Sequence, residues 1–379
     1  MTGKEKMQAA FSENGTAEIA AVLSCYEDIL QRDHWESLTQ YPWWYREEVD
    51  IEKQMLWRRE AIANTGEDWF RLPFCAPAET RQRQHVLETP EGIFLSDRGT
   101  GSRRELHRPP IGDWPEQGYK PPSTLAETPE AIDQMIPISE EDDYTYVRTE
   151  GRDALARALL GEFGDRLFPN HRTSSPLLRC ADLWGFDNMM VNIKVNPDLV
   201  TYACRRYLEQ AKTTVRRAAL LGAQGIWVVD GLSDMISPED YARLSLPNLQ
   251  DLIDEIRKAG MKSIYYFTGN PAGKWDLILS LGADALAFED DKKGFKVDVV
   301  ETATRLKGRC TLFGNLNAID VLQNGTDDQL REEVRRQLAA APLNGGRFIM
   351  SIGSPVTPGT SVERIRLYCD LVRDFGGIQ

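Results

Sequence analysis

Several polar and aromatic side chains stand at the ends of apolar runs, where they could do chemistry. Asp230 closes the run IWVVD and Glu289 closes ADALAFE, so either carboxylate could serve as a general acid or base. His171 follows DRLFPN and could act as an acid, a base or a metal ligand. Tyr266, in SIYYF, could protonate a leaving phenolate. These four residues form the predicted catalytic set, and each has a structural alternative such as capping a loop or packing in the core.

A second set of side chains is expected to bind a substrate rather than to react with it. Asn315 and Asn317 occupy the motif FGNLN, where an amide can bond a ligand or simply hold the loop. Trp44 belongs to an aromatic segment that could line an aryl pocket, although tryptophans more often pack in a core. The predicted substrate-binding residues are Trp44, Tyr265, Thr268, Asn315, Asn317 and Ser354.

The elements that must position these residues form repeated strand–helix units. From Gly151 onward, helical patterns alternate with short apolar runs that end in polar residues or glycine, as in units around a parallel sheet. A helix over 197–221 precedes a strand over 225–231, and the sequence SPED at Ser237 is typical of a helix start. Four or five consecutive units favour a (β/α)8 TIM barrel, whose strands deliver polar side chains to one mouth.

The first 150 residues are less regular. Helical patterns over 4–11 and 49–64 predict an N-terminal helical extension, and the nearby apolar runs EIAAVLS and WFRLPF predict the first strands. Residues 86–143 are rich in proline and charge and predict a β-hairpin followed by an extended segment. We therefore expect one α/β barrel domain over 1–379, with 86–143 as an insertion within it.

Charge and hydropathy exclude several classes of partner. The formal net charge of −13 disfavours nucleic acid and anionic lipid, because both attract basic surfaces. No run of about 18 apolar residues occurs, and the N-terminus lacks the pattern of a secretion signal. These features predict a cytoplasmic protein with a small-molecule substrate and no nucleic-acid or membrane partner, and they are compatible with a homodimer.

Five segments, in order along the chain, resemble the uroporphyrinogen decarboxylase superfamily. They are MTGKEKMQAAF, DLWGFDNMMVNIKVNPDLV, ISPEDYARLSLPNLQDLIDEIRKAG, FGNLNAIDVLQNGT and GGRFIMSIGSPVTPGTSVERI. The superfamily includes the tetrapyrrole decarboxylase and methyltransferases that exchange methyl groups with corrinoid proteins. The resemblance implies a barrel with a deep cleft at the carboxyl ends of its strands, in agreement with the pattern of units.

Departures from the family pattern narrow the expected chemistry. In the zinc-dependent methyltransferases that this chain resembles, a His-x-Cys pair precedes a strand-end glycine and a third thiolate follows the last strand. Here Tyr266 and Thr268 precede Gly269, and Ser354 stands in place of the third thiolate. We therefore expect no thiol-ligated zinc and assign no metal ligands. The arginine-rich decarboxylase segment is also replaced by YPWWYREEVD, in which only Arg46 is basic.

The combined pattern predicts a corrinoid-dependent methyltransferase. It would move a methyl group from a small methylated substrate, for example a methoxylated aromatic compound (O-demethylation), to a corrinoid (cobalamin) carried by a partner protein. The resemblance leaves two alternatives open. One is a cofactor-independent decarboxylase acting on a smaller acid, and the other is a binding barrel without catalysis.

Overall fold

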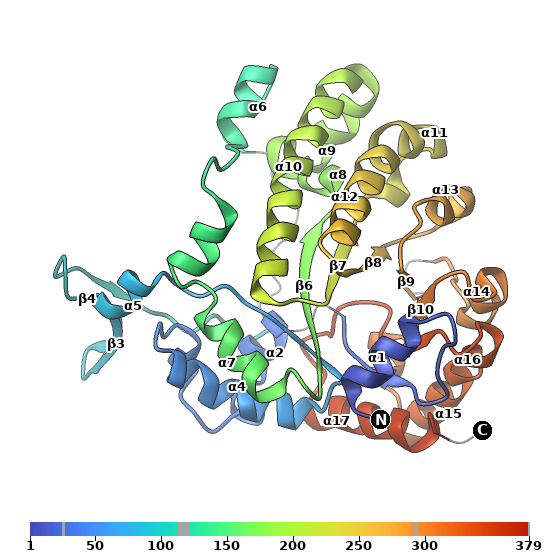
Figure 1. The fold of residues 1–379 in the computed structure, drawn as a ribbon, viewed down its shortest axis with the longest axis horizontal. Coiled ribbons are helices and arrows are strands. Elements are labelled where there is room, and N and C mark those ends of the chain that lie inside the picture. Colours follow the sequence, from blue (N-terminus) through green and yellow to red (C-terminus); the bar gives the residue numbers. More distant parts are fainter. Residues whose placement is uncertain (25–26, 113–121, 291–293, 378–379) are drawn as a thin grey trace.

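Parallel strands form a curled sheet at the centre of the molecule. The computed structural model describes residues 1–24, 27–112, 122–290 and 294–377. Within them, an eight-stranded sheet has the order β1-β11-β10-β9-β8-β7-β6-β2, and each neighbouring pair is parallel (Figure 1). The strands are β1 (Ala20–Ala21), β2 (Trp69–Arg71), β6 (Phe168–Ser174), β7 (Gly225–Asp230), β8 (Lys262–Phe267), β9 (Ala285–Phe288), β10 (Thr311–Phe313) and β11 (Phe348–Met350). The predicted (β/α)8 barrel fold is confirmed.

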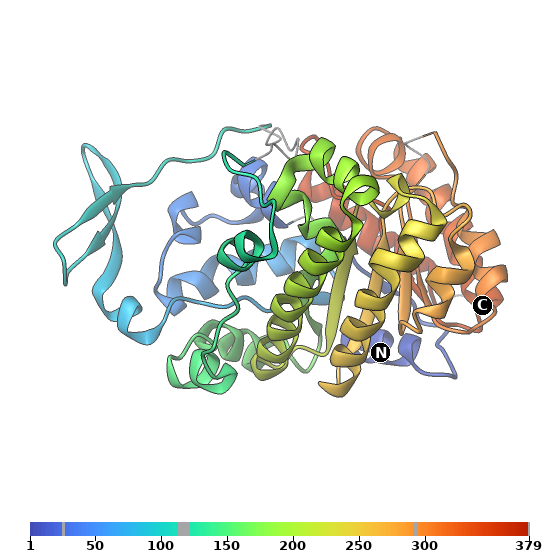
Figure 2. The ribbon, with the colours of Figure 1, turned by 90° about the horizontal axis from the view of Figure 1, so that it is seen from above.

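Helices cover the outside of the sheet (Figure 2). Those that lie between two strands make the right-handed crossovers that parallel strands require, whereas the helix over 3–11 precedes β1 and the helix over 362–375 follows β11. The larger ones are α1 (Gly3–Phe11), α4 (Ile51–Thr65), α7 (Ala154–Phe163), α9 (Ala181–Val195), α10 (Pro197–Leu221), α12 (Leu246–Lys258), α14 (Val299–Leu306), α15 (Asp327–Leu338) and α17 (Val362–Phe375). Shorter ones near the strand ends are α2 (Glu27–Asp33), η1 (Trp43–Arg46), α8 (Pro176–Arg179), η3 (Ser233–Met235), α11 (Pro238–Asp240), η4 (Tyr241–Ser245), α13 (Trp275–Ser280) and η5 (Ala318–Gln323).

Most predicted elements occur at the expected positions. The helix expected over 197–221 is α10, which ends at Gly222 in the left-handed conformation with a φ of 98°. Ser237 caps α11 as predicted, but a π-helical stretch, η4, separates α11 from α12. No helix among the described residues is long and apolar enough to cross a bilayer.

Two apolar clusters pack against the two faces of the sheet. The inner one fills the barrel with large rings, among them Trp69, Phe168, Trp227 and Phe313. The outer one lies between the strands and the surrounding helices and includes Ile226 of β7. Because successive side chains in a strand point to opposite faces, every strand of this sheet except β6 contributes to both clusters.

The two outermost strands of the sheet, β1 and β2, meet through side-chain carboxylates. The backbone N–H of Asp68 donates to the carbonyl oxygen of Ala21 over 2.9 Å. In return, the N–H of Ala21 donates to the Asp68 carboxylate over 2.8 Å, and the N–H of Leu23 donates to Glu67 over 2.9 Å. All three bonds are short, and Asp68 and Glu67 are buried, so these carboxylates complete the hydrogen bonding where the barrel closes.

The predicted hairpin forms a small separate sheet that projects from the barrel (Figure 1). Strands β3 (Gln84–Thr89), β4 (Gly92–Asp97) and β5 (Arg103–Glu105) pair antiparallel in the order β3-β4-β5. Nearly every side chain in it is at least partly exposed. Residues 113–121 of the expected insertion lie outside the described residues.

Candidate active site

Strand alternation decides which side chains enter the barrel. Trp227 of β7 and Tyr266 of β8 belong to the inner cluster, and their rings lie 5.2 Å apart. Their strand neighbours Val228 and Tyr265 belong to the outer cluster. The same alternation sends the Asp230 side chain outward, although we predicted that it would enter the cleft.

Asp230 lies in a closed polar cluster between the sheet and the helices. It is fully buried, and its carboxylate accepts hydrogen bonds from Ser175 at 2.6 Å, from Ser233 at 2.9 Å and from Tyr265. The Tyr265 hydroxyl also bonds that of Tyr241, at 2.9 Å. Burial raises the pKa of Asp230 to about 6, although the three hydroxyl groups oppose the shift. The side chains of Asp230 and Tyr265 are thus kept from contact with a ligand in the barrel.

His171 lies in the middle of β6 and not at a strand end as expected. Its side chain is buried on the outer face, where the ring packs edge-on against Phe74 with a centroid distance of 5.5 Å. Nδ1 is 2.8 Å from the carbonyl oxygen of Leu72. Burial lowers the pKa of His171 to about 4, so the imidazole is neutral at neutral pH.

Other predicted residues do reach the inner face. The hydroxyl of Tyr266 is buried and donates to the carbonyl oxygen of Gly353 at 2.8 Å, which places it beside Ser354. Ser354 is fully buried, and its hydroxyl has no hydrogen-bond partner among the described residues. Thr268 follows Tyr266 in the inward register, is partly exposed and donates to the backbone oxygen of Asp230 at 3.2 Å.

Glu289 and Asn315 lie next to each other at the ends of β9 and β10. Glu289 is buried, and its backbone oxygen accepts the Asn315 amide at 3.2 Å. The same amide donates to the backbone oxygen of Val297 at 2.6 Å, so Asn315 holds two loops together. Asn317 caps η5 by accepting from the N–H groups of residues 319 and 320. Both amides therefore have the structural role that the sequence left open.

Trp44 lies apart from the inner cluster. It belongs to the short helix η1, is half-buried and meets Trp43 edge-on at 6.0 Å. Arg46, two residues further along η1, lines the large cavity described next. The predicted aryl pocket at Trp44 therefore stays a prediction.

An arginine-rich cavity opens at the carboxyl ends of β2, β6 and β7. Its volume is about 660 Å³. Val229 of β7 and Ser174 of β6 lie on its wall, and among the described residues Asp28 is the one acidic residue that lines it. The basic lining residues are Arg32, Arg46, Arg71, Arg172 and Arg179. We call this cavity the arginine mouth; its lining favours an anionic ligand, because guanidinium groups bind carboxylates in a planar, two-pronged geometry.

A narrow extension leads from the arginine mouth into the barrel. It is lined by Trp69, Asn170 and Trp227 as well as by Arg71 and Arg172. The indole N–H of Trp227 is buried and has no hydrogen-bond partner among the described residues. The extension has room for a water-sized group only, about 30 Å³, and Glu27 also lines it.

Acidic residues hold the arginines of the mouth in place. Arg71 pairs with Glu27 at 2.9 Å, and Arg172 pairs with Asp28 at 3.1 Å. Arg46 lies 4.0 Å from the same Asp28 and 3.9 Å from Glu47. Because the side chains of Arg46 and Arg172 are each 33% exposed, a bound carboxylate can compete with these partners for the two guanidinium groups.

Arg71 and Arg172 were not among the predicted site residues, and Arg46 was noted only as the one basic residue of YPWWYREEVD. Arg71 lies two residues after Trp69 and Arg172 lies four residues after Phe168, so both have the inward register of those rings. That register was the available signal, but the strand was expected to end at His171, whereas β6 continues to Ser174. Among the described residues, no group of three or more His, Cys, Asp or Glu side chains is placed to hold a metal ion.

Comparison with known proteins identifies the family. The family model "Uroporphyrinogen decarboxylase (URO-D)" matches residues 159–375, more than half of the chain. The chain therefore belongs to the uroporphyrinogen decarboxylase family, as the sequence resemblance predicted.

Relatives within this family carry two different activities in their names. Uroporphyrinogen decarboxylase from Solibacter usitatus is 25% identical over 154 residues, covering 41% of this chain and 42% of the relative. Methylcobamide:CoM methyltransferase MtbA from Methanosarcina mazei is 23% identical over 190 residues, covering 49% and 51%. The chain spans about half the length of the curated relatives it matches.

A solved structure extends the likeness to the whole chain. A methyltransferase from Methanosarcina mazei superposes with a TM-score of 0.68 at 14% identity and covers 99% of both chains. At this identity the match establishes a common fold. The chain is thus a member of an enzyme family that includes decarboxylases and methyltransferases.

Proposed function

We propose that this protein takes a methyl group from a small methylated acid, such as a methoxylated aromatic acid, and passes it to a corrinoid carried by a partner protein. The observation that supports this function is the arginine mouth. Guanidinium groups bind a carboxylate, and the mouth, with about 660 Å³ and with Ile29 and Val229 on its wall, has room for a substituted ring. Such a mouth suits a compact aromatic acid.

Some residues of the chain would bind the substrate, and others would transfer a proton to it. Arg71 and Arg172 hold the carboxylate of the substrate, and Ile29 and Val229 contact its ring in the mouth. The bond between the methyl carbon and the substrate oxygen breaks, and that oxygen takes a proton from the inward hydroxyl of Tyr266. Ser354 and Glu289 lie on the same inner side and complete the polar surroundings, whereas Asp230 and His171 support the strands from behind.

The corrinoid would belong to the partner and would supply the cobalt that accepts the methyl group. The rim of the mouth fits such a group in one respect. The side chains of Arg46 and Arg172 are each 33% exposed and can donate to the amide oxygens that edge a corrin ring. A docked partner would also exclude water from the mouth.

The test is a methyl-transfer assay with the full chain, a reduced corrinoid carrier and methoxylated benzoates. We expect methylcorrinoid to form, and we expect Arg172→Gln to lower kcat/KM by at least about tenfold through loss of a charge-assisted bond. Arg331→Gln is the matched control, because Arg331 is paired only with Asp328 on α15, away from the mouth. Absence of transfer from every methoxylated acid, with free and with protein-bound corrinoid, would refute the proposal.

The arginine mouth also supports a second candidate, a decarboxylase that acts on a small acid. Both candidates need a bound carboxylate, but only one of them releases it as carbon dioxide. Incubation of the same acids, labelled at the carboxyl carbon and without corrinoid, separates the two. Release of labelled carbon dioxide by the unaltered protein, together with loss of this release in Arg172→Gln, would favour the decarboxylase.

A further inference from the structure

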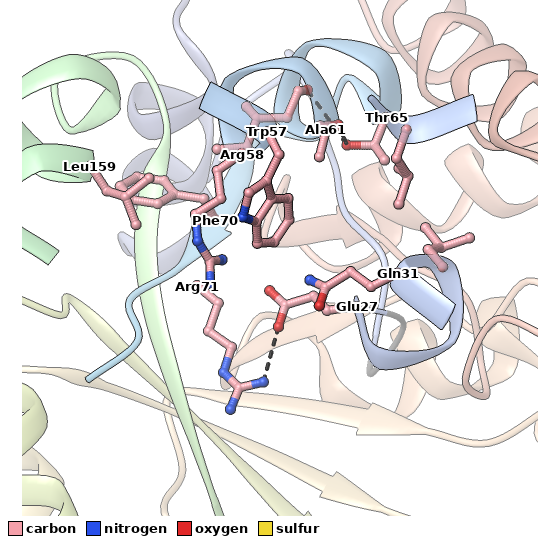
Figure 3. A pocket seen from close by; sticks show the side chains of 12 residues that line it. Glu27, Gln31, Trp57, Arg58, Ala61, Thr65, Phe70, Arg71 and Leu159 are labelled. Atoms are coloured by element: carbon pink, nitrogen blue, oxygen red, sulfur yellow. Dashed lines mark hydrogen bonds and ion pairs between the residues drawn. The ribbon is translucent and has the colours of Figure 1, made fainter. Parts of the chain in front are cut away.

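A second, smaller hollow lies beside the arginine mouth, behind the ion pair of Arg71 and Glu27 (Figure 3). Helix α4 and strand β2 form its walls, with Leu30, Leu38, Ala61, Ile62, Phe70 and Leu159 among the apolar lining residues. The centre of a water-sized molecule can move over about 50 Å³ inside it. The hollow therefore admits a group of a few atoms but not an aromatic ring.

The hollow contains hydrogen-bond donors that lack acceptors. The guanidinium of Arg58 stacks on the Trp57 ring, 4.3 Å from its centroid. Among the described residues its hydrogen bonding is limited to one contact, from Nε to Gln54 at 3.3 Å, and it forms no ion pair. The buried Nε1 of Trp57 and the buried Nε of Arg71 also have no partner among the described residues. Figure 3 shows the indole nitrogen of Trp57 on the side that faces the Arg58 guanidinium.

The charge balance of the hollow is positive. Its charged lining residues are Arg58, Arg71 and Glu27, and Glu27 is already paired with Arg71 at 2.9 Å. Burial lowers the pKa of Arg58 to about 10, Glu27 opposes this shift, and the neighbouring Arg71 and Arg46 add to it. Arg58, which is partly buried, thus remains charged at neutral pH and has no direct counterion among the described residues.

We propose that this hollow is a binding site for a small monovalent anion of carboxylate size, held by Arg58 together with the N–H groups of Trp57 and Arg71. The apolar walls limit the size of the anion, and the Glu27 carboxylate disfavours a second negative charge on it. Because Arg71 lines both the hollow and the arginine mouth, the bound anion would lie next to the substrate acid without occupying its place. This site is additional to the methyl-transfer function proposed above and does not depend on it.

Formate is the probe for the test, and benzoate, which is too large for the hollow and can bind only in the mouth, is the control whose binding should not change in Arg58→Gln. Calorimetric titration of the full chain should give saturable formate binding in the millimolar range. We expect Arg58→Gln to weaken it at least about tenfold and Trp57→Phe, which keeps the ring but removes the N–H, to weaken it about threefold or more. Arg59→Gln is the matched control, because Arg59 is the next residue on α4 and its exposed side chain pairs with Glu162.

Formate could also bind in the arginine mouth, and the variants distinguish the two places. If Arg172→Gln removes formate binding while Arg58→Gln and Trp57→Phe leave it intact, the proposal is wrong. It is equally wrong if formate does not bind at all. Circular dichroism of each variant checks its folding. For a variant that does not fold, bromide soaked into crystals of the unaltered protein gives the answer, because an anomalous peak inside the hollow, in contact with the Arg58 guanidinium, is required.

Discussion

At the scale of single residues, the orientation of a side chain matters more than its place along a strand. Asp230 stands at the carboxyl end of β7, as predicted, yet it faces the helices because Trp227 and Val229 take the inward positions. The run IWVVD is apolar on both faces, since both are buried, and so carries no signal of which residues face inward. The inward direction expected for Tyr266 agrees with its place in the inner cluster, whereas the direction of Asp230 could not be predicted.

The buried carboxylate of Asp230 should make stability depend on pH. Its pKa is raised to about 6 in the folded protein, against 3.8 ordinarily. The protonated form is thus favoured by folding, and this stabilisation is present below about pH 4 and lost as the pH rises through 6. Relative to Asp230→Asn, which does not titrate, the wild-type free energy of unfolding should fall by about 3 kcal/mol between pH 4 and pH 7.

Urea denaturation of both proteins over this pH range measures the difference. Other titrating groups are common to the two proteins and cancel to first order. A constant difference between wild type and Asp230→Asn from pH 4 to pH 7 would show that the buried aspartate has an ordinary pKa. The activity of Asp230→Asn at neutral pH would separately show whether the outer polar cluster affects the site.

At the scale of elements, the units from β7 to α17 were predictable because each follows a simple order of helix, glycine or proline, and apolar strand. The exceptions have local physical causes. Strand β6 contains Pro169, Asn170 and His171, which are uncommon within a strand, so the strand was expected to end there. The π-helical segment η4 interrupts what the sequence predicts as one continuous helix before Pro247. The helical spacing of apolar residues does not reveal this interruption.

The turn after β8 depends on glycine for two reasons. Gly269 has a φ of +94°, and a Cβ there would lie 1.9 Å from a carboxylate oxygen of Asp234 in η3. Gly260, after α12, has a φ of +75° but open space around it. A substitution at Gly260 therefore tests the backbone strain without a steric clash. We expect Gly260→Ala to lower the free energy of unfolding by about 1 kcal/mol and Gly269→Ala by at least about 2 kcal/mol.

Thermal and urea denaturation of both glycine variants give the comparison. The additional loss in Gly269→Ala measures the close approach of η3 to the end of β8, which shapes the loop after Thr268. Equal losses would mean that Asp234 moves aside without cost. Activity should follow the same order, because the loops at the strand ends form the mouth.

At the scale of the whole molecule, the arginine mouth is assembled from distant parts of the chain. Arg46 comes from η1, Arg71 from β2 and Arg172 from β6, and no local motif connects them. Only the closed arrangement of the strands brings them together. This explains why the fold and its family could be predicted from the sequence while the main cationic feature of the site could not.

Barrel closure therefore has consequences for the site, and Asp68 offers a direct test of it. Its carboxylate accepts the buried N–H of Ala21 at 2.8 Å where β1 and β2 meet. Asp68→Ala leaves that N–H without an acceptor and should lower the free energy of unfolding by about 1–3 kcal/mol. Amide hydrogen exchange at Ala21 should become faster, because the local opening between β1 and β2 becomes easier.

Asp370→Ala is the matched control for this test. Asp370 pairs with Arg373, as Asp68 does at 3.9 Å, but its side chain is 44% exposed and lies on the surface of α17. Exposed pairs contribute about 0–1 kcal/mol, so this variant should remain close to wild type. Asp68→Asn keeps a side-chain oxygen and should lose less than Asp68→Ala. If Asp68→Ala matches Asp370→Ala in stability and leaves the Ala21 amide protected, the side-chain bridge does not hold the barrel closed.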